Sequence, residues 1–319
     1  VEDVKLPMYV SVFTTVLNIF LDYAMIFGKF GFTQMGIKGA ALATTISAWL
    51  GVLLILAVSF IKKNILYAPI KDSFGFKWKD IKIFYKKAMP VIFNETMWGA
   101  GTFIFNIIFG HMGYEYFAAI TILRSFESIA FVFIIGLCNA CSIMVGKSIG
   151  KGKIERGIDD TKRFIMIFPV VSLIIAILIY VFRPELIGIF NLSDNISEVT
   201  LNAAMSIMAF YAFEFTIRQI PYLMIVGIFR SGGDTVTGVK YDLLSLWLLS
   251  IPATLIAVYM IKVPFTVAFA VMYIFEDYVK TLLCIKYYKS MKWIKPVTVE
   301  GKSALVDYLQ QKGVKNATR

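Results

Sequence analysis

Eight long apolar stretches constrain this 319-residue chain more than any other feature of its sequence. Each is about 20 residues long or longer, which is the length that a helix needs to cross the ~30 Å hydrocarbon core of a bilayer. The chain is 58% hydrophobic and only 17% charged, whereas soluble domains are about 45–50% apolar and about 25% charged. The sequence therefore predicts an all-α membrane protein. The predicted spans are Tyr9–Phe27, Gly39–Phe60, Ala88–Gly110, Phe117–Val145, Phe164–Phe182, Ala203–Phe229, Tyr241–Ile261 and Phe265–Tyr288.

The basic residues predict how these spans are oriented. Lysine and arginine number 32 against 21 acidic residues, which gives a net charge of +11. If the N-terminus is cytoplasmic, 25 of the 32 fall in cytoplasmic segments, Arg124, Arg218 and Lys280 fall within spans, and only Lys29, Lys38, Arg183 and Lys262 fall on the external side. Lysine and arginine are enriched in cytoplasmic loops of membrane proteins. We therefore expect a multi-pass protein of the cell membrane with both termini in the cytoplasm, and no nucleic-acid partner.

The long connection at residues 62–87 is predicted to be an amphipathic cytoplasmic linker. In a helix, Trp78, Ile81, Phe84 and Tyr85 share one face, and the neighbouring lysines can meet anionic headgroups of the bilayer. Residues 88–290 then form a six-helix bundle, and residues 291–319 form a cytoplasmic tail.

A weak internal repeat relates the first two spans to the last two. Asp3 and Asp234 lead into the first and seventh spans, 231 residues apart, and Ala41-Leu42-Ala43 aligns with Ala268-Phe269-Ala270 at an offset of 227. A period of six spans implies two halves of equal orientation. Residues 1–61 are then the last two helices of a preceding bundle that lacks its first four. Chance similarity between apolar helices is the alternative.

Polar residues on the third span are candidates for cation coupling. Glu95, Thr102 and Asn106 share one helix face, and Glu95 has no cation within a helical turn. A charge at the bilayer centre costs about 2.5–3.5 kcal/mol, so it needs a partner, water or a function. Such a carboxylate can hold Na⁺ or carry a proton. The structural alternative is a protonated or hydrated packing carboxyl.

Most other charges within spans come in pairs. Their spacings predict three ion pairs, each within one helix: Arg124 with Glu127, Glu214 with Arg218, and Glu276 with Lys280. Asp22 and Asp277 are left without an obvious partner.

Signals of a soluble enzyme or a cofactor site fail. Gly146-Lys147-Ser148 lacks the earlier glycine of a phosphate loop, because that position is Cys141. The single histidine, His111, excludes a histidine-rich metal site, and all three cysteines lie in apolar segments. We expect no cofactor, no metal site and no enzymatic activity.

Several stretches resemble the multidrug and toxic compound extrusion (MATE) family. They are Gly36 to Thr44, Met89-Pro90-Val91-Ile92-Phe93-Asn94-Glu95, Val145-Gly146-Lys147-Ser148-Ile149-Gly150 and Phe229-Arg230-Ser231-Gly232-Gly233-Asp234-Thr235. The resemblance implies two six-helix bundles around a cleft, of which this chain supplies the fifth to twelfth helices. It also implies an antiporter, coupled to Na⁺ or H⁺, that exports small organic cations or drugs.

The resemblance has two departures at positions that matter for coupling. In one branch of the family a glutamate lies eight residues after the proline, where this chain has Trp98, and an aspartate lies eleven residues before the arginine, where this chain has Gln219. The expected substrate cavity is lined by Asn94, Trp98, Tyr211, Glu214, Arg218 and Gln219. Two other functions remain alternatives, a flippase for a lipid-linked saccharide and, less favoured, a membrane-embedded transferase.

Overall fold

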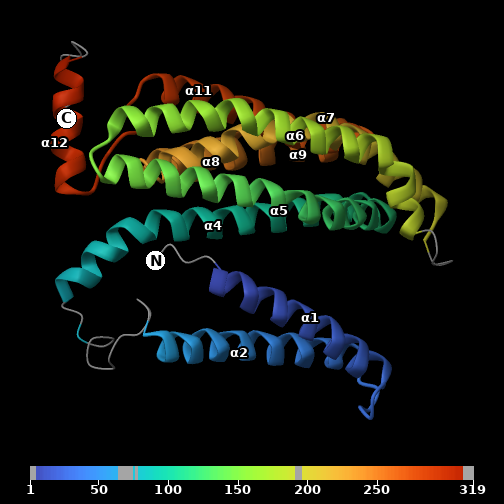
Figure 1. The fold of residues 1–319 in the computed structure, drawn as a ribbon. Coiled ribbons are helices and arrows are strands. Elements are labelled where there is room, and N and C mark those ends of the chain that lie inside the picture. Colours follow the sequence, from blue (N-terminus) through green and yellow to red (C-terminus); the bar gives the residue numbers. More distant parts are fainter. Residues whose placement is uncertain (1–4, 64–74, 76–77, 191–195, 312–319) are drawn as a thin grey trace. The chain divides into compact units, whose positions relative to one another are not determined.

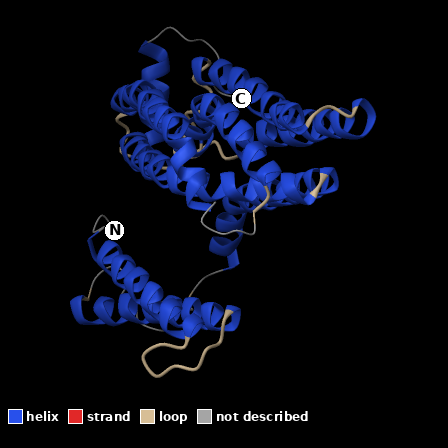
Figure 2. Ribbon diagram, turned by 90° about the vertical axis from the view of Figure 1, so that its right-hand side faces the viewer, coloured by secondary structure: helices blue, strands red, loops and turns tan. Residues whose placement is uncertain are grey.

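The computed structural model describes residues 5–63, 75, 78–190 and 196–311, and this part of the chain contains helices but no β-strand (Figures 1 and 2). Six helical segments in it are long and apolar enough to cross a membrane. The other two predicted spans, Ala88–Gly110 and Phe265–Tyr288, are also helical, but polar and charged residues such as Glu95 and Lys280 interrupt their apolar surface. The protein is thus an all-α, multi-pass membrane protein.

The chain forms two compact units, Val1–Ile83 and Phe84–Arg319. In the first unit, α1 (Lys5–Phe27) packs against α2 (Ile37–Lys62). Gly39 makes this packing close, because a Cβ atom there would lie 2.7 Å from the carbonyl oxygen of Met25. Many large apolar side chains of both helices are exposed, as lipid-facing helices require.

The second unit holds the remaining helices. They are α4 (Trp78–Met112), whose first residues belong to the first unit, α5 (Tyr114–Gly150), α6 (Ile154–Phe190), α7 (Glu198–Tyr222), α8 (Val236–Leu243), α9 (Ile251–Leu255), α10 (Phe265–Tyr273), α11 (Val279–Lys289) and α12 (Val299–Gln311). Helices α5, α6 and α7 pack on one another (Figure 1). Their buried residues include Ile134, Phe168 and Phe215. This core fixes α5 and α7, the two helices that form one wall of the site.

Four π-helical turns interrupt the last spans. They are η1 (Leu223–Phe229), η2 (Leu244–Ser250), η3 (Ile256–Ile261) and η4 (Ile274–Tyr278). A π-helical turn widens the helix and redirects its side chains, and such turns are frequent at functional sites. Here η4 carries two adjacent buried acids, Glu276 and Asp277.

The predicted linker and tail acquire structure where they are described. Helix α4 begins at Trp78 and runs without a break into the predicted third span, so residues 78–87 are not a separate surface helix. Helix α12 lies in the predicted tail and is tied to the end of α5, because the Thr298 hydroxyl donates to the Gly150 carbonyl at 2.7 Å. Residues 64–74 and 312–319, as well as Asp3 of the proposed repeat, lie outside the described residues.

The turn between η1 and α8 is organised by one buried carboxylate, Asp234, which is 2% exposed. It accepts hydrogen bonds from the backbone N–H groups of Val236 and Thr237, from the hydroxyls of Thr237 and Tyr287, and from Lys295 Nζ at 2.8 Å. We call Asp234, Thr237, Tyr287 and Lys295 the Asp234 cluster. Burial alone raises the pKa of Asp234, but the hydrogen bonds outweigh it and lower the pKa to about 2. The cluster therefore joins the α7–α8 turn to the segment after α11.

Candidate functional site

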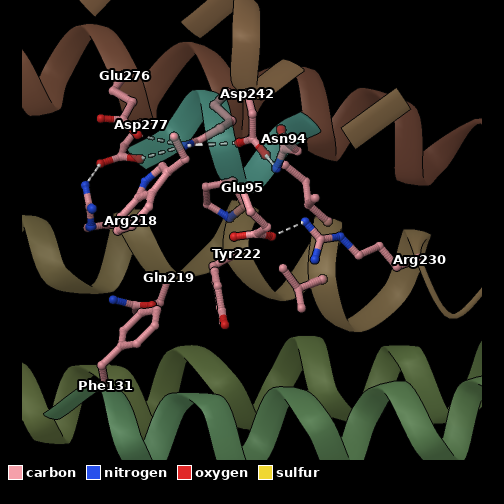
Figure 3. A pocket seen from close by; sticks show the side chains of 15 residues that line it. Asn94, Glu95, Phe131, Arg218, Gln219, Tyr222, Arg230, Asp242, Glu276 and Asp277 are labelled. Atoms are coloured by element: carbon pink, nitrogen blue, oxygen red, sulfur yellow. Dashed lines mark hydrogen bonds and ion pairs between the residues drawn. The ribbon is translucent and has the colours of Figure 1, made fainter. Parts of the chain in front are cut away.

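A cavity of about 210 Å³ lies inside the second unit, between α4, α5, α7 with η1, α8, η4 and α11 (Figure 3). Its wall contains four carboxylates, Glu95, Asp242, Glu276 and Asp277, and three basic side chains, Arg218, Arg230 and Lys280. Trp98, Phe131 and Tyr222 add aromatic surface. A second cavity of about 320 Å³ shares Trp98, Phe131, Arg218 and Glu276 with the first. The two cavities therefore adjoin one another at these four residues.

Lys280 of α11 is surrounded by carboxylates from two elements. Its Nζ atom lies 3.1 Å from Glu276 Oε1, 3.4 Å from Asp277 Oδ1 and 3.5 Å from Asp242 Oδ1. The side chains of Glu276 and Asp277 are almost completely buried. The predicted pair between Glu276 and Lys280 is present, but two further acids join it. We call Asp242, Glu276 and Asp277 the Lys280 cage.

Arg218 of α7 connects this cage to α5. Its Nη1 atom donates to Asp277 Oδ2 at 3.1 Å, and its Nε atom lies 3.9 Å from Glu127 Oε1. The guanidinium also lies over the ring of Tyr273, 4.7 Å from the centroid. The same Glu127 oxygen accepts a hydrogen bond of 2.7 Å from the Tyr211 hydroxyl. Ion pairs and hydrogen bonds thus run continuously from α8 through α11, η4 and α7 to α5.

Two of the three ion pairs predicted within single helices are not formed. Glu127 forms an ion pair with Arg218 and accepts a hydrogen bond from Tyr211, both on α7, rather than pairing with Arg124 on its own helix. Arg218 forms its ion pair with Asp277, and the Glu214 carboxylate interacts with the hydroxyl of Tyr278 instead. Helical spacing shows which side chains can meet, but contacts between helices decide which of them do.

Glu95 is compensated, contrary to the expectation from its own helix. Its Oε1 atom lies 2.9 Å from Arg230 Nη2, 135 residues further along the chain (Figure 3). The Glu95 side chain is nevertheless 59% exposed, so the ion pair borders open space. Thr102 lines the second cavity, whereas Asn106 lines neither cavity. The predicted stripe of Glu95, Thr102 and Asn106 is therefore not one coordination shell.

The expected substrate-cavity residues divide into two groups. Asn94, Trp98, Arg218 and Gln219 line the first cavity. Tyr211 and Glu214 are fully buried and line neither of the two cavities. The Gln219 side chain is 0% exposed to bulk solvent, and neither atom of its amide has a hydrogen-bond partner. A buried amide loses free energy as long as it stays unpaired.

Sequence reasoning missed Asp242 and the role of Arg230. Asp242 lies at the start of α8's span, where a charge is usually explained by the membrane surface. It is bound by the amide of Asn94, whose Nδ2 atom donates to Asp242 Oδ2 at 3.0 Å. The signal available in the sequence was Asp242 itself, an acid within the predicted seventh span that has no basic residue three or four positions away.

The fold and the site together define a class of protein. A bundle of membrane-spanning helices that encloses a charged cavity is the arrangement of a polytopic membrane transporter. The family model described as MatE matches residues 90–256, which is more than half of the chain. The chain belongs to the MatE family, which is a family of transporters and not of enzymes.

Several known proteins are similar to this chain. The probable multidrug resistance protein NorM of Thermotoga maritima is 28% identical over 293 residues, which cover 92% of this chain and 61% of that protein. The uncharacterized transporter YisQ of Bacillus subtilis is 23% identical over 294 residues, covering 91% and 62%. The chain therefore spans about three fifths of the length of these relatives.

Solved structures show the same fold. The crystal structure of a MATE protein in complex with MaL6 is similar with a TM-score of 0.76 at 18% identity, covering 90% of this chain and 62% of that one. The same values are found for a MOP superfamily transporter from Pyrococcus furiosus, whose description states a reverse polarity of its binding pocket.

Proposed function

We propose that this protein is an exporter of small organic cations and drugs that is driven by the entry of Na⁺ or H⁺. The observation that carries the proposal is the cavity inside the bundle, where carboxylates outnumber basic side chains. The similarity to proteins named as probable multidrug resistance proteins supports the same function.

The charges of the cavity favour cations as the transported species. Carboxylates within a membrane protein need compensation, because an unpaired charge in a low-dielectric surrounding is costly. The cavity keeps an excess of one carboxylate after its three basic residues are counted. An entering cation meets this negative charge and the aromatic faces of Trp98 and Tyr222, which attract flat organic cations. A saccharide flippase, which carries an anionic phosphate, is disfavoured because each of these basic residues is already paired with an acid.

Glu95 is the residue that we assign to coupling. Because its carboxylate is largely exposed, an ion or a proton can reach it without disturbing the buried network. Binding of either cation neutralises Glu95 and releases Arg230, and Arg230 sits at the end of η1, next to the Asp234 turn. The coupling ion therefore breaks the ion pair that joins α4 to the α7–α8 turn.

The test is export from proteoliposomes containing the protein at the full length that its gene encodes, under imposed Na⁺ and proton gradients. Glu95→Gln keeps the size of the side chain and removes its charge, so export should fall about tenfold or more, while equilibrium binding of the drug changes less. Glu155→Gln, which changes an exposed glutamate at the start of α6, is the matched control and should export normally. If Glu95→Gln exports as fast as the parent protein under both gradients, Glu95 is not the coupling residue.

We also propose that both termini face the cytoplasm. Lys153 and Glu198 lie at opposite ends of α6 and α7, and both are exposed. In a background without Cys138, Cys141 and Cys284, a cysteine at position 198 should react with an impermeant thiol reagent applied outside the cell, whereas one at position 153 should not. The reverse pattern would invert the topology.

A further inference from the structure

The number of carboxylates around Lys280 equals the number of N–H groups on its ammonium. A lysine ammonium has three donors and no acceptor. Three carboxylate oxygens, one each from Asp242, Glu276 and Asp277, lie 3.1–3.5 Å from Nζ. The contact with Glu276 is a hydrogen bond, and the contacts with Asp242 and Asp277 are ion pairs. The Lys280 cage therefore places one carboxylate oxygen near the ammonium for each of its three N–H groups.

Side chains outside the cage hold two of the three carboxylates in place. Asp242 Oδ2 accepts from Asn94, and Asp277 Oδ2 accepts from Arg218, at 3.0 and 3.1 Å. In each aspartate the other oxygen, Oδ1, faces Lys280. For Asp277 this oxygen is buried and has no hydrogen-bond partner, because its 3.4 Å contact with Nζ is an ion pair only. Asp242 and Asp277 are thus positioned by partners other than Lys280, as in a preorganised site.

The spacing of the cage suits an ammonium rather than a metal ion. In the described part of the chain, no group of three acidic, histidine or cysteine side chains is arranged to hold a metal ion. Hydrogen bonds from ammonium to oxygen are about 2.7–3.2 Å long, whereas Ca²⁺ binds oxygen at about 2.3–2.6 Å. The cage distances begin within the first range and extend beyond it.

The cage also opens onto space that a guest can fill. Lys280 and all three acids line the first cavity together with Trp98, Tyr222 and the unpartnered amide of Gln219. An alkyl or aryl group attached to an ammonium in the cage would lie along these side chains, with Gln219 available for a polar substituent.

We propose that the Lys280 cage is a binding site for protonated primary amines, which enter by displacing the ammonium of Lys280. The tethered ammonium keeps the site filled in the resting protein and competes with every guest. Displacement exchanges one R–NH₃⁺ for another, so the charge of the cage stays constant and no carboxylate is left uncompensated. The claim that such amines are exported rests on the proposed function, whereas the claim that they bind to the Lys280 cage does not.

A competing internal ligand lowers the affinity for the guest by the fraction of time that the site is free. If Lys280 occupies the cage about nine tenths of the time, its removal should raise the affinity for an amine about tenfold. Quaternary ammonium ions have no N–H donors, so their affinity should rise little when Lys280 is removed.

The experiment is isothermal titration calorimetry of the purified full-length protein in detergent with n-hexylammonium and with hexyltrimethylammonium. Lys280→Ala should bind hexylammonium about tenfold more tightly than the parent, with little change for hexyltrimethylammonium. Lys280→Arg keeps a cation in the cage and serves as the matched control, which should show no gain. A folded Lys280→Ala protein that gains no affinity, or that gains equally for both probes, would overturn the proposal.

Removing Lys280 leaves three acids close together, so a second variant guards against misfolding. Glu276→Gln/Lys280→Ala removes one negative charge along with the positive charge and keeps two carboxylate acceptors. It should bind hexylammonium more tightly than Glu276→Gln alone, and equal binding by the two would also overturn the proposal. Absence of export in the proteoliposome assay would reject the proposed function but leave these binding results standing.

Discussion

Two clusters of this protein are built around buried carboxylates, but they satisfy them to different degrees. The Asp234 cluster surrounds its single carboxylate with five donors, from two backbone and three side-chain groups. Lys280 and Arg218 share their donors among several acids, and neither amide atom of the nearby Gln219 has a hydrogen-bond partner.

This difference separates a structural cluster from a binding site. A saturated carboxylate gains nothing from a ligand, so the Asp234 cluster can only hold two segments of the chain together. An incompletely satisfied network beside a cavity gains free energy when a ligand supplies the missing partners. Both clusters contain buried charged residues. Only the hydrogen bonds of their carboxylates distinguish the structural cluster from the binding site.

The largest effect is expected for Arg218→Ala. This change leaves Asp277, which is 1% exposed, without its guanidinium partner and also removes the cation next to Glu127. Removing one partner of a buried ion pair costs about 3–5 kcal/mol, so thermal unfolding in detergent should shift strongly downward. Arg218→Lys keeps the charge and should lose less. A melting temperature unchanged by Arg218→Ala would show that the network does not support the fold.

Asp234→Asn should have a smaller effect that is confined to stability. The amide keeps the shape of the side chain but loses the charge that attracts Lys295, and we expect a loss of about 2 kcal/mol. Hexylammonium binding, measured by calorimetry, should not change. A marked loss of amine binding with normal stability would contradict the structural role of the cluster.

The Asp234 cluster also predicts a dependence on acid pH. The carboxyl has a pKa of about 2 in the folded protein against 3.8 as its ordinary value. Because folding lowers this pKa, the stabilisation is fully present above about pH 4 and is lost as the pH falls through about 2. The difference in melting temperature between the parent and Asp234→Asn should therefore shrink over this range. If the difference grows on acidification instead, folding does not lower the pKa of Asp234.

Tyr211→Phe should sharpen the comparison with a milder change in the network. It removes one hydrogen bond to Glu127 and leaves the ring packed against Phe215 and Tyr273. The expected loss is about 1 kcal/mol, which should be visible as a small decrease in melting temperature. A decrease as large as that of Arg218→Ala would mean that the hydroxyl, and not the guanidinium, organises Glu127.

The smallest effect is expected for Lys162→Ala. Lys162 forms an ion pair with Asp159 at 2.9 Å, but both side chains are about 60% exposed. Solvent screens this pair, so the melting temperature should not change measurably. A clear destabilisation would show that ion-pair distance, rather than burial, governs the energetics of this protein.

The helices could be predicted from the sequence, whereas the contacts of the site could not. Apolar length alone located the long helices, because the bilayer fixes the number of residues that a span requires; six helical segments in the described part of the chain are long and apolar enough to cross a membrane. The partner of Glu95 lies 135 residues away, on the turn after η1, and no periodicity within one helix indicates it. Arg218 likewise exchanges the expected Glu214 for Asp277. Such choices depend on which helix faces meet and on the π-helical turns, and both are properties of the packed bundle.

The two adjacent glycines before Asp234 have a consequence for how this protein is able to diverge. A Cβ atom on Gly232 would lie 2.5 Å from the Trp293 ring, and one on Gly233, where φ is +97°, would lie 2.0 Å from the Lys295 carbonyl oxygen. Any other residue at either position displaces main chain or a buried indole. We therefore expect substitutions at both positions to be selected against for steric reasons alone. A position that does not tolerate substitution can therefore be steric in origin or can bind a ligand. Only the atoms that surround the residue show which of the two causes applies.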